Sequence, residues 1–445
     1  MKYTRNVAIT TVIANMIGTG VFTSLGFQLL DFPSGIPDAF AIMMVWTIGG
    51  LIALCGAFAY AEIATTLKES GGEYLFLSKI YHPSLGFTSG WISLVAGFGA
   101  PIAAAAIAIG TYSAPFLGIN TETIYSIGGF ECPQFKIVSI VCVILVSVIH
   151  MFGVKAGGIA QNILTGIKLS LIVFFCIMPF VFSDYETSHI SFAPTSTSWD
   201  MIFSLPFAGA LVYVMYAYSG WNASAYIAGD LENPKKNLPF SLIVGTLVVM
   251  VCYVLLNAVF LYTTPVGSMV GQVEIGNIVS NHVLGSAWGK FFSAVFSLAL
   301  LSTMSAMVIA GPRVTESMGK DFSLFSWLSR KGKGGTPIFA IVLQATFAIL
   351  LVMISSFEDM IKYIGITLLI FSMLTVIGVF VLRIRKPELE RPFKAWGYPF
   401  TPIIFCIATC WMIVYFAKDD PYKLLYSLLT IVSGLIIYFF IQKKR

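Results

Sequence analysis

The stretch "NMIGTGVFTSL" (residues 15–25) lies in the middle of an uncharged run that is long enough to cross a bilayer. Glycine inside a helix is less favourable than alanine by about 1 kcal/mol, and it leaves backbone groups open to other bonding partners. Here Gly18 and Gly20 flank Thr19 at the centre of the run. The pattern therefore predicts a membrane-spanning helix that is interrupted near its midpoint.

The composition of the whole chain indicates a membrane protein. Of 445 residues, 57% are hydrophobic and 11% are charged, and the mean hydropathy is +0.87. A typical soluble protein is about 25% charged. The apolar runs are continuous rather than alternating, which excludes a β-barrel. We predict an all-α polytopic membrane protein with twelve transmembrane helices, at residues 6–30, 39–62, 85–114, 136–152, 157–183, 201–229, 238–264, 286–312, 337–356, 361–382, 400–417 and 422–442.

The positions of lysine and arginine predict the orientation, because positive residues near helix ends stay in the cytoplasm. With the N-terminus inside, twenty of the 26 basic residues fall on the inner side and five on the outer side, while Lys168 remains within a span. We therefore predict an integral protein of the cell membrane (plasma or inner) with both termini cytoplasmic. This bias accounts for the net charge of +5 without a nucleic-acid partner.

The chemistry-bearing residues do not indicate an enzyme or a metal protein. Seven cysteines and four histidines are scattered along the chain, without CxxC or HExxH spacing. The apolar runs hold no cluster of His, Asp or Glu. We expect no cofactor, no metal and no catalytic site.

A second irregular stretch occurs in the sixth span, "YVMYAYSGWNASAYIAGD" (residues 213–230). Many secondary transporters consist of two inverted repeats, each with an interrupted helix near the bilayer midplane, and they bind substrate between the two interruptions. Five spans separate the two irregular stretches, which fits a repeat of five helices. The alternative is that the glycines serve only to let helices pack closely.

Interrupted helices expose backbone groups of both polarities. Free N–H groups at the start of a half-helix favour an anion, and free carbonyls at the end of one favour a cation. An α-amino acid carries both charges within one small backbone. We expect the N–H groups of Gly18, Thr19 and Gly20 to bind its carboxylate. We expect its ammonium to meet carbonyls around Met16, Ile17, Tyr216 and Ser219.

Seven short motifs occur in order along the chain: "MIGTGVF" (16–22), "FAYAEI" (58–63), "ESGGEYLFL" (69–77), "GFTSGW" (86–91), "QNILTGIKL" (161–169), "YSGWNASAYIAGDLENPKKNLP" (218–239) and "AGPRVTESMGKD" (310–321). With these motifs the chain resembles the amino acid, polyamine and organocation transporter family, which has the five-plus-five inverted-repeat fold of the bacterial leucine transporter. The resemblance implies one repeat in residues 1–183, a second in 200–383, and peripheral helices 11 and 12 with a short tail in 398–445.

Lys168 lies about eleven residues into the fifth predicted span, too deep for its ammonium to reach the cytoplasm easily. A charge at that depth is costly and indicates a functional site. The resemblance matches Lys168 to a lysine that replaces a sodium ion in many proton-coupled or ion-independent members of the family. We expect its ammonium to bind carbonyls of the first helix and to take part in coupling. The alternative is a structural anchor.

The remaining candidates each have a second interpretation. Glu62 ends the second span and is either a coupling group or an interfacial carboxylate. Around the second break, Tyr216, Ala217, Gly220 and Trp221 either contact substrate or only pack. Two serines on one face of the eighth span either line the pocket or bond within their own helix, namely Ser302 and Ser305.

One predicted outer loop carries Cys132. In heteromeric animal members of the family a cysteine in this loop joins a glycoprotein partner. A single cysteine beside a proline does not lead us to predict a covalent partner here.

The sequence thus predicts a secondary active transporter that moves α-amino acids by alternating access, independent of sodium and driven by proton coupling or exchange. No Asp or Glu occurs in the predicted helices 1, 3, 6, 8 and 10 where they would face substrate, which favours neutral side chains. We expect amino acid, protons and membrane lipid as partners. Two alternatives stay open: an amino-acid receptor or channel-like protein on the same fold, and a carrier of polyamines or organic cations.

Overall fold

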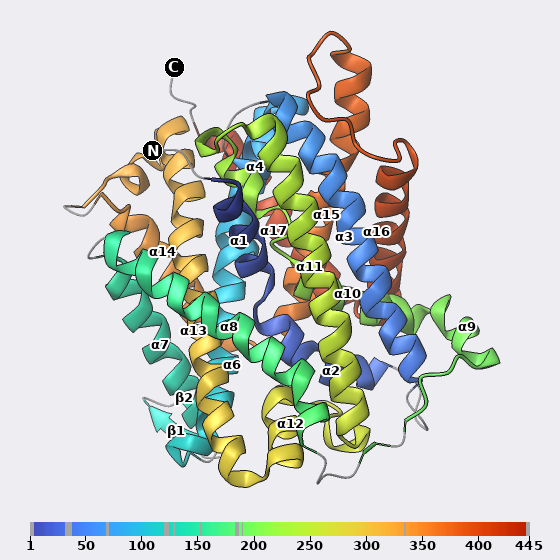
Figure 1. Ribbon diagram of the computed structural model, residues 1–445. Helices are drawn as coiled ribbons and strands as arrows, with labels where there is room; N and C mark the ends of the chain where they lie inside the picture. Colours follow the sequence, from blue (N-terminus) through green and yellow to red (C-terminus); the bar gives the residue numbers. More distant parts are fainter. Residues whose placement is uncertain are drawn as a thin grey trace.

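The computed structural model describes residues 4–31, 38–67, 71–119, 124–127, 130–151, 154–182, 187–188, 190–332 and 335–441. Helices run through almost all of these ranges (Figure 1). The first half contains α1 (Arg5–Met16), α2 (Thr19–Asp31), α3 (Ala39–Leu67), α4 (Gly72–Ile80), α5 (Pro83–Ile92), the π-helical η1 (Ser93–Gly99), α6 (Ala100–Leu117), α7 (Gln134–Met151) and α8 (Val154–Val181). The second half contains α9 (Ser196–Ile202), α10 (Leu205–Tyr218), η2 (Ala223–Asp230), α11 (Pro234–Thr263), η3 (Val266–Ser268), α12 (Ile275–Leu284), α13 (Ser286–Asp321), η4 (Ser326–Ser329), α14 (Ile338–Ile354), α15 (Phe357–Arg385), α16 (Phe400–Asp419) and α17 (Pro421–Phe440).

Within the described ranges, nine segments are long and apolar enough to span a membrane. A tenth span would combine Ser196–Ile202 with Leu205–Gly229, which meet at an angle of 65°. Two shorter apolar helices, Thr165–Val181 and Ile338–Ile354, coincide with the fifth and ninth predicted spans. The chain is therefore a polytopic helical membrane protein, and the count of twelve spans stays a prediction.

The two helix interruptions expected from the sequence are both present. The first separates α1 from α2 at Ile17 and Gly18, where Ile17 leaves the helical region with φ −71° and ψ 95°. The second lies between α10 and η2, where Gly220 has a φ of +96°. Only glycine adopts such a positive φ without strain, so Gly220 ends α10 at a defined point.

Short elements that were not predicted connect the long helices. A hairpin of β1 (Ile124–Ile127) and β2 (Phe130–Pro133) pairs antiparallel, with Tyr125 opposite Cys132. The fold is helical as predicted, and this hairpin is a local addition to it. Because strands of four residues carry little of the apolar signal that reveals spans, the sequence pattern did not indicate them.

Large aromatic side chains lie in the interior, and apolar side chains also cover much of the surface. Large side chains such as Trp46, Tyr112 and Tyr253 are fully buried between helices. Others, such as Phe180 and Ile354, are largely exposed. Exposed apolar side chains along long helices are what a hydrocarbon environment requires, and the backbone polar groups are satisfied within each helix.

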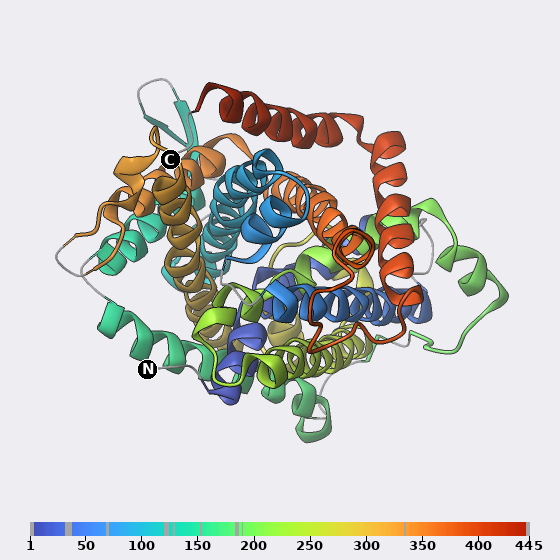
Figure 2. The same ribbon diagram turned by 90° about the horizontal axis from the view of Figure 1, so that it is seen from above.

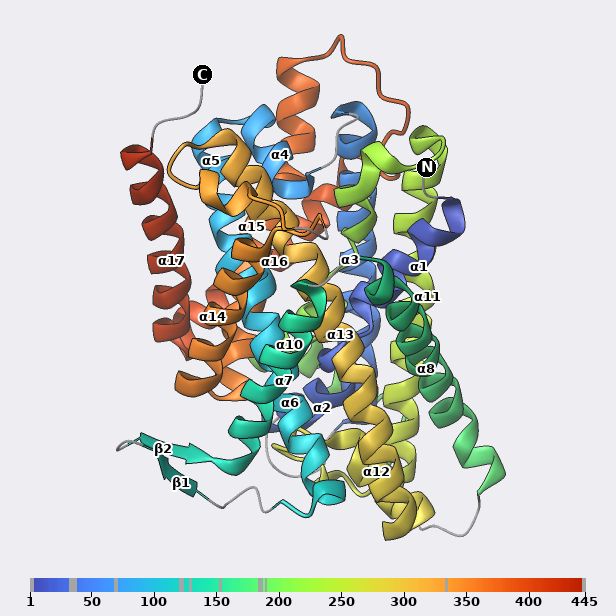
Figure 3. The ribbon, with the colours of Figure 1, turned by 90° about the vertical axis from the view of Figure 1, so that its left-hand side faces the viewer.

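The last two helices lie at the edge of the bundle, as the view from above shows (Figure 2). Of the residues of α17, only Ser427 and Gly434 are buried. Both chain ends lie at the same end of the molecule, opposite the β1–β2 hairpin (Figure 3). An even number of membrane crossings produces this arrangement.

Candidate functional site

The two helix breaks touch each other at the centre of the molecule. The Thr19 and Tyr216 hydroxyls are 2.7 Å apart and hydrogen-bonded. The Tyr253 hydroxyl, from α11, lies 2.6 Å from the Met16 carbonyl oxygen and 3.1 Å from that of Ala217. The breaks therefore form one continuous site, with Tyr253 bridging them.

Close approach explains one of the two glycines of the first break. A Cβ atom on Gly20 would lie 2.5 Å from the Cα atom of Ala217, so α2 and α10 could not approach as closely with any other residue. For Gly20 the packing interpretation applies. At Gly18 the nearest contact would be the Thr303 methyl at 3.1 Å, which is less restrictive.

The backbone groups at the breaks are only partly open. Helix α2 begins at Thr19, so the N–H groups of its first turn lack intrahelical acceptors and carry partial positive charge. The carbonyls of Met16 and Ile17 each accept one hydrogen bond, from Tyr253 and Lys168 respectively. A carbonyl oxygen has two lone pairs, so each retains capacity for a second donor.

Lys168 lies where α8, α13 and the first break meet, and its side chain is 1% exposed. Its ammonium donates to the Ile17 carbonyl at 2.6 Å and to the Thr303 hydroxyl at 3.0 Å, with Ala14 at 3.4 Å. The contact with the first helix that the sequence led us to expect is present. In the described part of the chain, no group of three or more His, Cys, Asp or Glu is placed to hold a metal ion.

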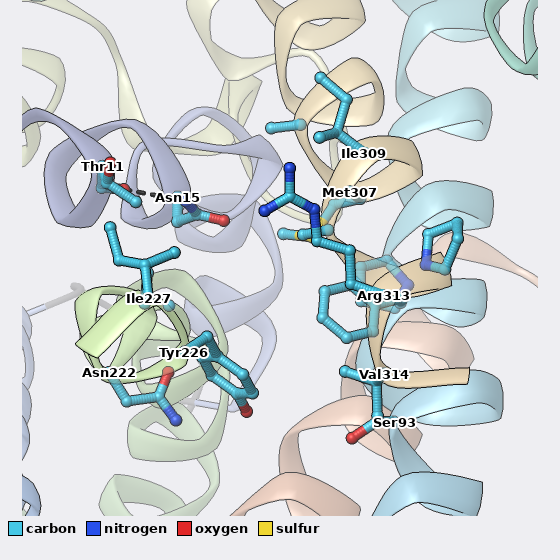
Figure 4. A pocket seen from close by; sticks show the side chains of 18 of the residues that line it. Thr11, Asn15, Ser93, Asn222, Tyr226, Ile227, Met307, Ile309, Arg313 and Val314 are labelled. Carbon is cyan, nitrogen blue, oxygen red and sulfur yellow. Dashed lines mark hydrogen bonds between the residues drawn. The ribbon is translucent and has the colours of Figure 1, made fainter. Parts of the chain in front are cut away.

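A cavity of about 1180 Å³ begins at the breaks and extends between η2 and α13 (Figure 4). Asn15, Tyr216, Ser219, Gly220 and Trp221 line its inner part. Its other end, on the side of the chain termini, is lined by charged side chains from α13 and the segment after it. They include Arg313, Glu316, Lys320 and Lys331.

This charged end of the cavity reaches solvent. The side chains of Lys320 and Lys331 are 61% and 52% exposed, and both form ion pairs with Glu316, at 2.8 and 3.2 Å. The cavity is therefore accessible from one side of the molecule.

A cavity at paired helix breaks, open to one side, suits a small zwitterion, and the chain's relatives agree. A family model described as amino acid permease matches residues 7–441. The chain belongs to the amino acid permease family. This permease is therefore a member of a transporter family and not an enzyme.

Several relatives resemble the permease over nearly its whole length. The serine/threonine exchanger SteT of Bacillus subtilis is 28% identical, over 98% of this chain and 96% of that protein. The b(0,+)-type amino acid transporter 1 of Mus musculus is 27% identical, over 96% and 85%. The cystine/glutamate transporter of Homo sapiens is 25% identical, over 97% and 83%.

Some residues expected at the site lie elsewhere in the permease. Ser302 and Ser305 are not among the described residues that line the cavity. Ser305 instead bonds to His150 of α7, with 2.8 Å between its oxygen and Nε2. The bond between Ser305 and a side chain of α7 fits the packing alternative for that residue, and a substrate contact for either serine stays a prediction.

The first break also contributes less to the cavity wall than expected. Met16, Ile17, Gly18, Thr19, Gly20 and Ala217 are absent from the described lining. Four of them bond instead to the side chains of Lys168, Tyr216 and Tyr253, whereas Gly18 and Gly20 lie closest to Thr303 and Ala217.

Glu62 lies in an ion-pair cluster away from the cavity. Its carboxylate accepts two bonds from Arg383 of α15, at 2.8 and 2.7 Å, and one from the Ala395 backbone N–H at 2.7 Å. Two parallel bonds between arginine and a carboxylate define a strong and oriented contact. This geometry fits the interfacial interpretation of Glu62 better than a coupling role.

A second carboxylate that the sequence did not indicate, Glu73 of α4, lines the cavity and is 5% exposed. Its Oε1 atom accepts hydrogen bonds from the Tyr60 hydroxyl, from the Ser372 hydroxyl at 3.2 Å and from the Asn222 amide at 3.4 Å. Burial raises the pKa of Glu73, while the bonds from Tyr60 and Ser372 act in the opposite direction.

One local signal for this arrangement was present in the sequence. Glu73 follows Gly71 and Gly72, which have φ values of +137° and +55°. A Cβ atom on Gly72 would lie 2.2 Å from the Tyr226 ring, so the glycine allows η2 to approach α4. The glycine pair in "ESGGEYLFL" thus indicated a close contact between elements, but it did not show that the second element is η2.

Proposed function

We propose that this permease is a sodium-independent secondary transporter that moves α-amino acids by alternating access, coupled to protons or to counter-exchange. The observation that carries this proposal is the Lys168 ammonium bonded to the Ile17 carbonyl inside the first break. This contact places a positively charged side chain beside a helix interruption that suits a zwitterion.

The surroundings of Lys168 support sodium independence. Its three acceptors, the carbonyls of Ala14 and Ile17 and the hydroxyl of Thr303, are oxygen atoms of the kind that hold sodium at broken helices. The ammonium already provides the positive charge that they require. A sodium ion at the same place would meet both repulsion and lack of space.

The substrate's charged groups fit the two breaks in complementary ways. The first turn of α2 offers N–H groups to a carboxylate, and the second lone pairs at Met16 and Ile17 suit an ammonium. Tyr216 and Trp221 are placed to cover a substrate from the side of the second break, since both line the cavity.

The name of one relative favours exchange over symport, since SteT of Bacillus subtilis is called a serine/threonine exchanger. With cytoplasmic termini, as the basic residues predict, the open end of the cavity faces the cytoplasm. The structure then corresponds to an inward-facing state of the cycle.

Uptake into proteoliposomes tests the proposal. Purified permease is reconstituted with an internal amino acid, and uptake of a labelled panel is followed with sodium or choline outside and with or without a proton gradient. We expect saturable uptake that is unchanged in choline. Failure of all amino acids to enter, or a strict need for sodium, would contradict the proposal. Binding without transport would favour the receptor alternative.

The position of Glu73 bears on which class of substrate side chain the cavity accepts. The expectation of neutral substrates assumed that no carboxylate faces the cavity from the predicted helices 1, 3, 6, 8 and 10. Glu73 reaches the cavity from α4, outside those helices. The absence of an acidic residue therefore no longer supports a restriction to neutral amino acids.

A further inference from the structure

The cavity has a lateral bay, which we define by Glu73, Asn222, Tyr226 and Ser372, all of which line the cavity. Three structural elements donate to its single carboxylate: α3 through Tyr60, α15 through Ser372, and the turn before η2 through Asn222. Figure 4 shows Asn222 and Tyr226 together on one wall of the cavity. A buried carboxylate is thus held in one orientation at the wall of the transport cavity.

The donors around Glu73 are all neutral. Among the residues that the structure describes, no lysine, arginine or histidine side chain forms an ion pair with it. Glu316, the other glutamate of the lining, has its charge matched by Lys320 and Lys331. Burying a carboxylate without a matching cation costs free energy. A cation that enters the bay would offset part of this cost by pairing with Glu73, since no side chain of the protein does so among the described residues.

Aromatic rings complete the bay. Trp221, Tyr226 and Phe405 line the cavity beside Glu73. The Trp221 ring packs edge-on against Tyr60 with centroids 4.6 Å apart, and Tyr60 donates to Glu73. A carboxylate in a cavity lined by aromatic rings suits organic ammonium and guanidinium groups, because a ring face that meets the cation adds to the charge attraction.

The bay is within reach of a substrate bound at the breaks. Consecutive turns join the second break to the bay, with hydrogen bonds from the Trp221 N–H to the Tyr218 carbonyl at 3.3 Å and from the Ala223 N–H to the Gly220 carbonyl at 2.9 Å. The Cα atoms at the two ends of such a turn lie within about 7 Å of each other. A lysine side chain has five single bonds of about 1.5 Å between Cα and the terminal nitrogen, or roughly 6 Å when extended. The cavity is continuous between the second break and the bay.

We propose that the bay is a subsite for the cationic side chain of a basic amino acid, with Glu73 as its counter-ion. This inference rests on the proposed function, since the breaks hold the α-carboxylate and α-ammonium. It assigns to the permease the ability to accept lysine-like substrates.

Competition with the unmodified permease gives the first test. The experiment measures how strongly lysine and 2-aminoheptanoate inhibit the uptake of a labelled neutral amino acid. In 2-aminoheptanoate a methyl group replaces the terminal ammonium of lysine. We expect lysine to inhibit at a concentration at least about tenfold lower. Equal inhibition by the two compounds, or weaker inhibition by lysine, would overturn the subsite. The labelled compound is a neutral amino acid that the uptake panel has shown to enter, and if no amino acid of that panel enters, the proposed function fails instead.

A pair of variants gives the second test. Glu73→Gln keeps the size of the side chain and removes its charge, whereas Ser372→Ala keeps the charge and removes one donor. We expect Glu73→Gln to raise the lysine concentration for half-inhibition about tenfold and to change that for 2-aminoheptanoate less than about twofold. Ser372→Ala should leave the preference for lysine in place. An equal effect of Glu73→Gln on both inhibitors would overturn the proposal by showing a structural role.

Discussion

At the scale of single residues, the Lys168 ammonium ties three elements together by donating to the Ile17 carbonyl and the Thr303 hydroxyl. Replacement with methionine keeps most of the side-chain volume but leaves these oxygens without a donor, at about 1–3 kcal/mol for each buried group. We expect Lys168→Met to lower exchange at least about tenfold. The measurement is uptake by equal amounts of folded protein, confirmed by size-exclusion chromatography.

The exposed Lys290 provides a control for this variant. Lys290→Met changes the same formal charge at a position outside the cavity lining and should leave exchange unchanged. If Lys168→Met transports like the unmodified protein, the role of Lys168 in transport is refuted.

A second residue-scale prediction concerns Glu274, just before α12. Burial raises its pKa to about 7. The folded state therefore binds more protons than the unfolded state between roughly pH 4.5 and 7, and stability falls as the pH rises through this window. Because the side chain is partly exposed, the loss is at most about 3 kcal/mol. We expect Glu274→Gln to raise the unfolding temperature at pH 8 and to have little effect at pH 4.5.

Thermal unfolding in detergent across this pH range measures the difference between Glu274→Gln and the unmodified protein. A difference that stays constant from pH 4.5 to pH 8 would contradict the shifted pKa.

Residues differ in how far the sequence could reveal their roles. Lys168 was recognisable because a charge inside an apolar run is costly in any fold. Glu73 was not, because α4 lies outside the spans and only the tertiary arrangement brings it to the cavity. Thr303 and Tyr253 carry no local signal, since hydroxyl groups are common in membrane helices. The spacing of Gln161, Thr165 and Lys168 predicts that they share one face of the fifth predicted span, but the side chain of Gln161 lies outside those that the structure describes.

At the scale of elements, the contact between α2 and α10 depends on one glycine. Gly20→Ala would place a methyl group 2.5 Å from the backbone Cα atom of Ala217, and α2 and α10 would have to move apart to make room for it. Overpacking of this kind costs about 1–3 kcal/mol. We expect a lower unfolding temperature and reduced transport. Gly267→Ala is the matched control, because nothing lies within 4 Å of its added Cβ.

The helix breaks themselves were predictable, because two glycine clusters in otherwise apolar runs were separated by five spans. What the sequence could not indicate is their mutual contact. The Thr19–Tyr216 bond joins residues 197 positions apart, and only the packing of α2 on α10 creates it. Unaltered stability of Gly20→Ala would show that this packing tolerates more adjustment than the distances imply.

At the scale of the whole molecule, the predicted orientation puts the β1–β2 hairpin outside the cell and the loop before α11 inside. Cys132 on β2 is partly exposed. A membrane-impermeant maleimide should label it on intact cells, and Cys132→Ser should abolish this labelling. In the Cys132→Ser background, Lys236→Cys at the opposite end should react only after the membrane is opened. The reverse pattern would invert the topology.

The long spans followed from hydropathy alone, because a bilayer imposes length and apolarity on every crossing. The hairpin, the π-helical η1 and the bend between α9 and α10 did not, because they depend on local hydrogen bonds that leave the apolar pattern unchanged. The cavity shape arises from these irregular elements, as η1 and η2 both contribute lining residues.

The Tyr253 hydroxyl carries one proton but lies within hydrogen-bond distance of two carbonyl oxygens, at Met16 and Ala217. It can satisfy both fully only by alternating or by sharing that proton. A substrate ammonium that took over the Met16 carbonyl would release the proton to Ala217. The bridge that Tyr253 makes between Met16 and Ala217 would then be lost, and the bound substrate itself would become the link between the two breaks. Such a ligand would close the breaks against each other only when it is present.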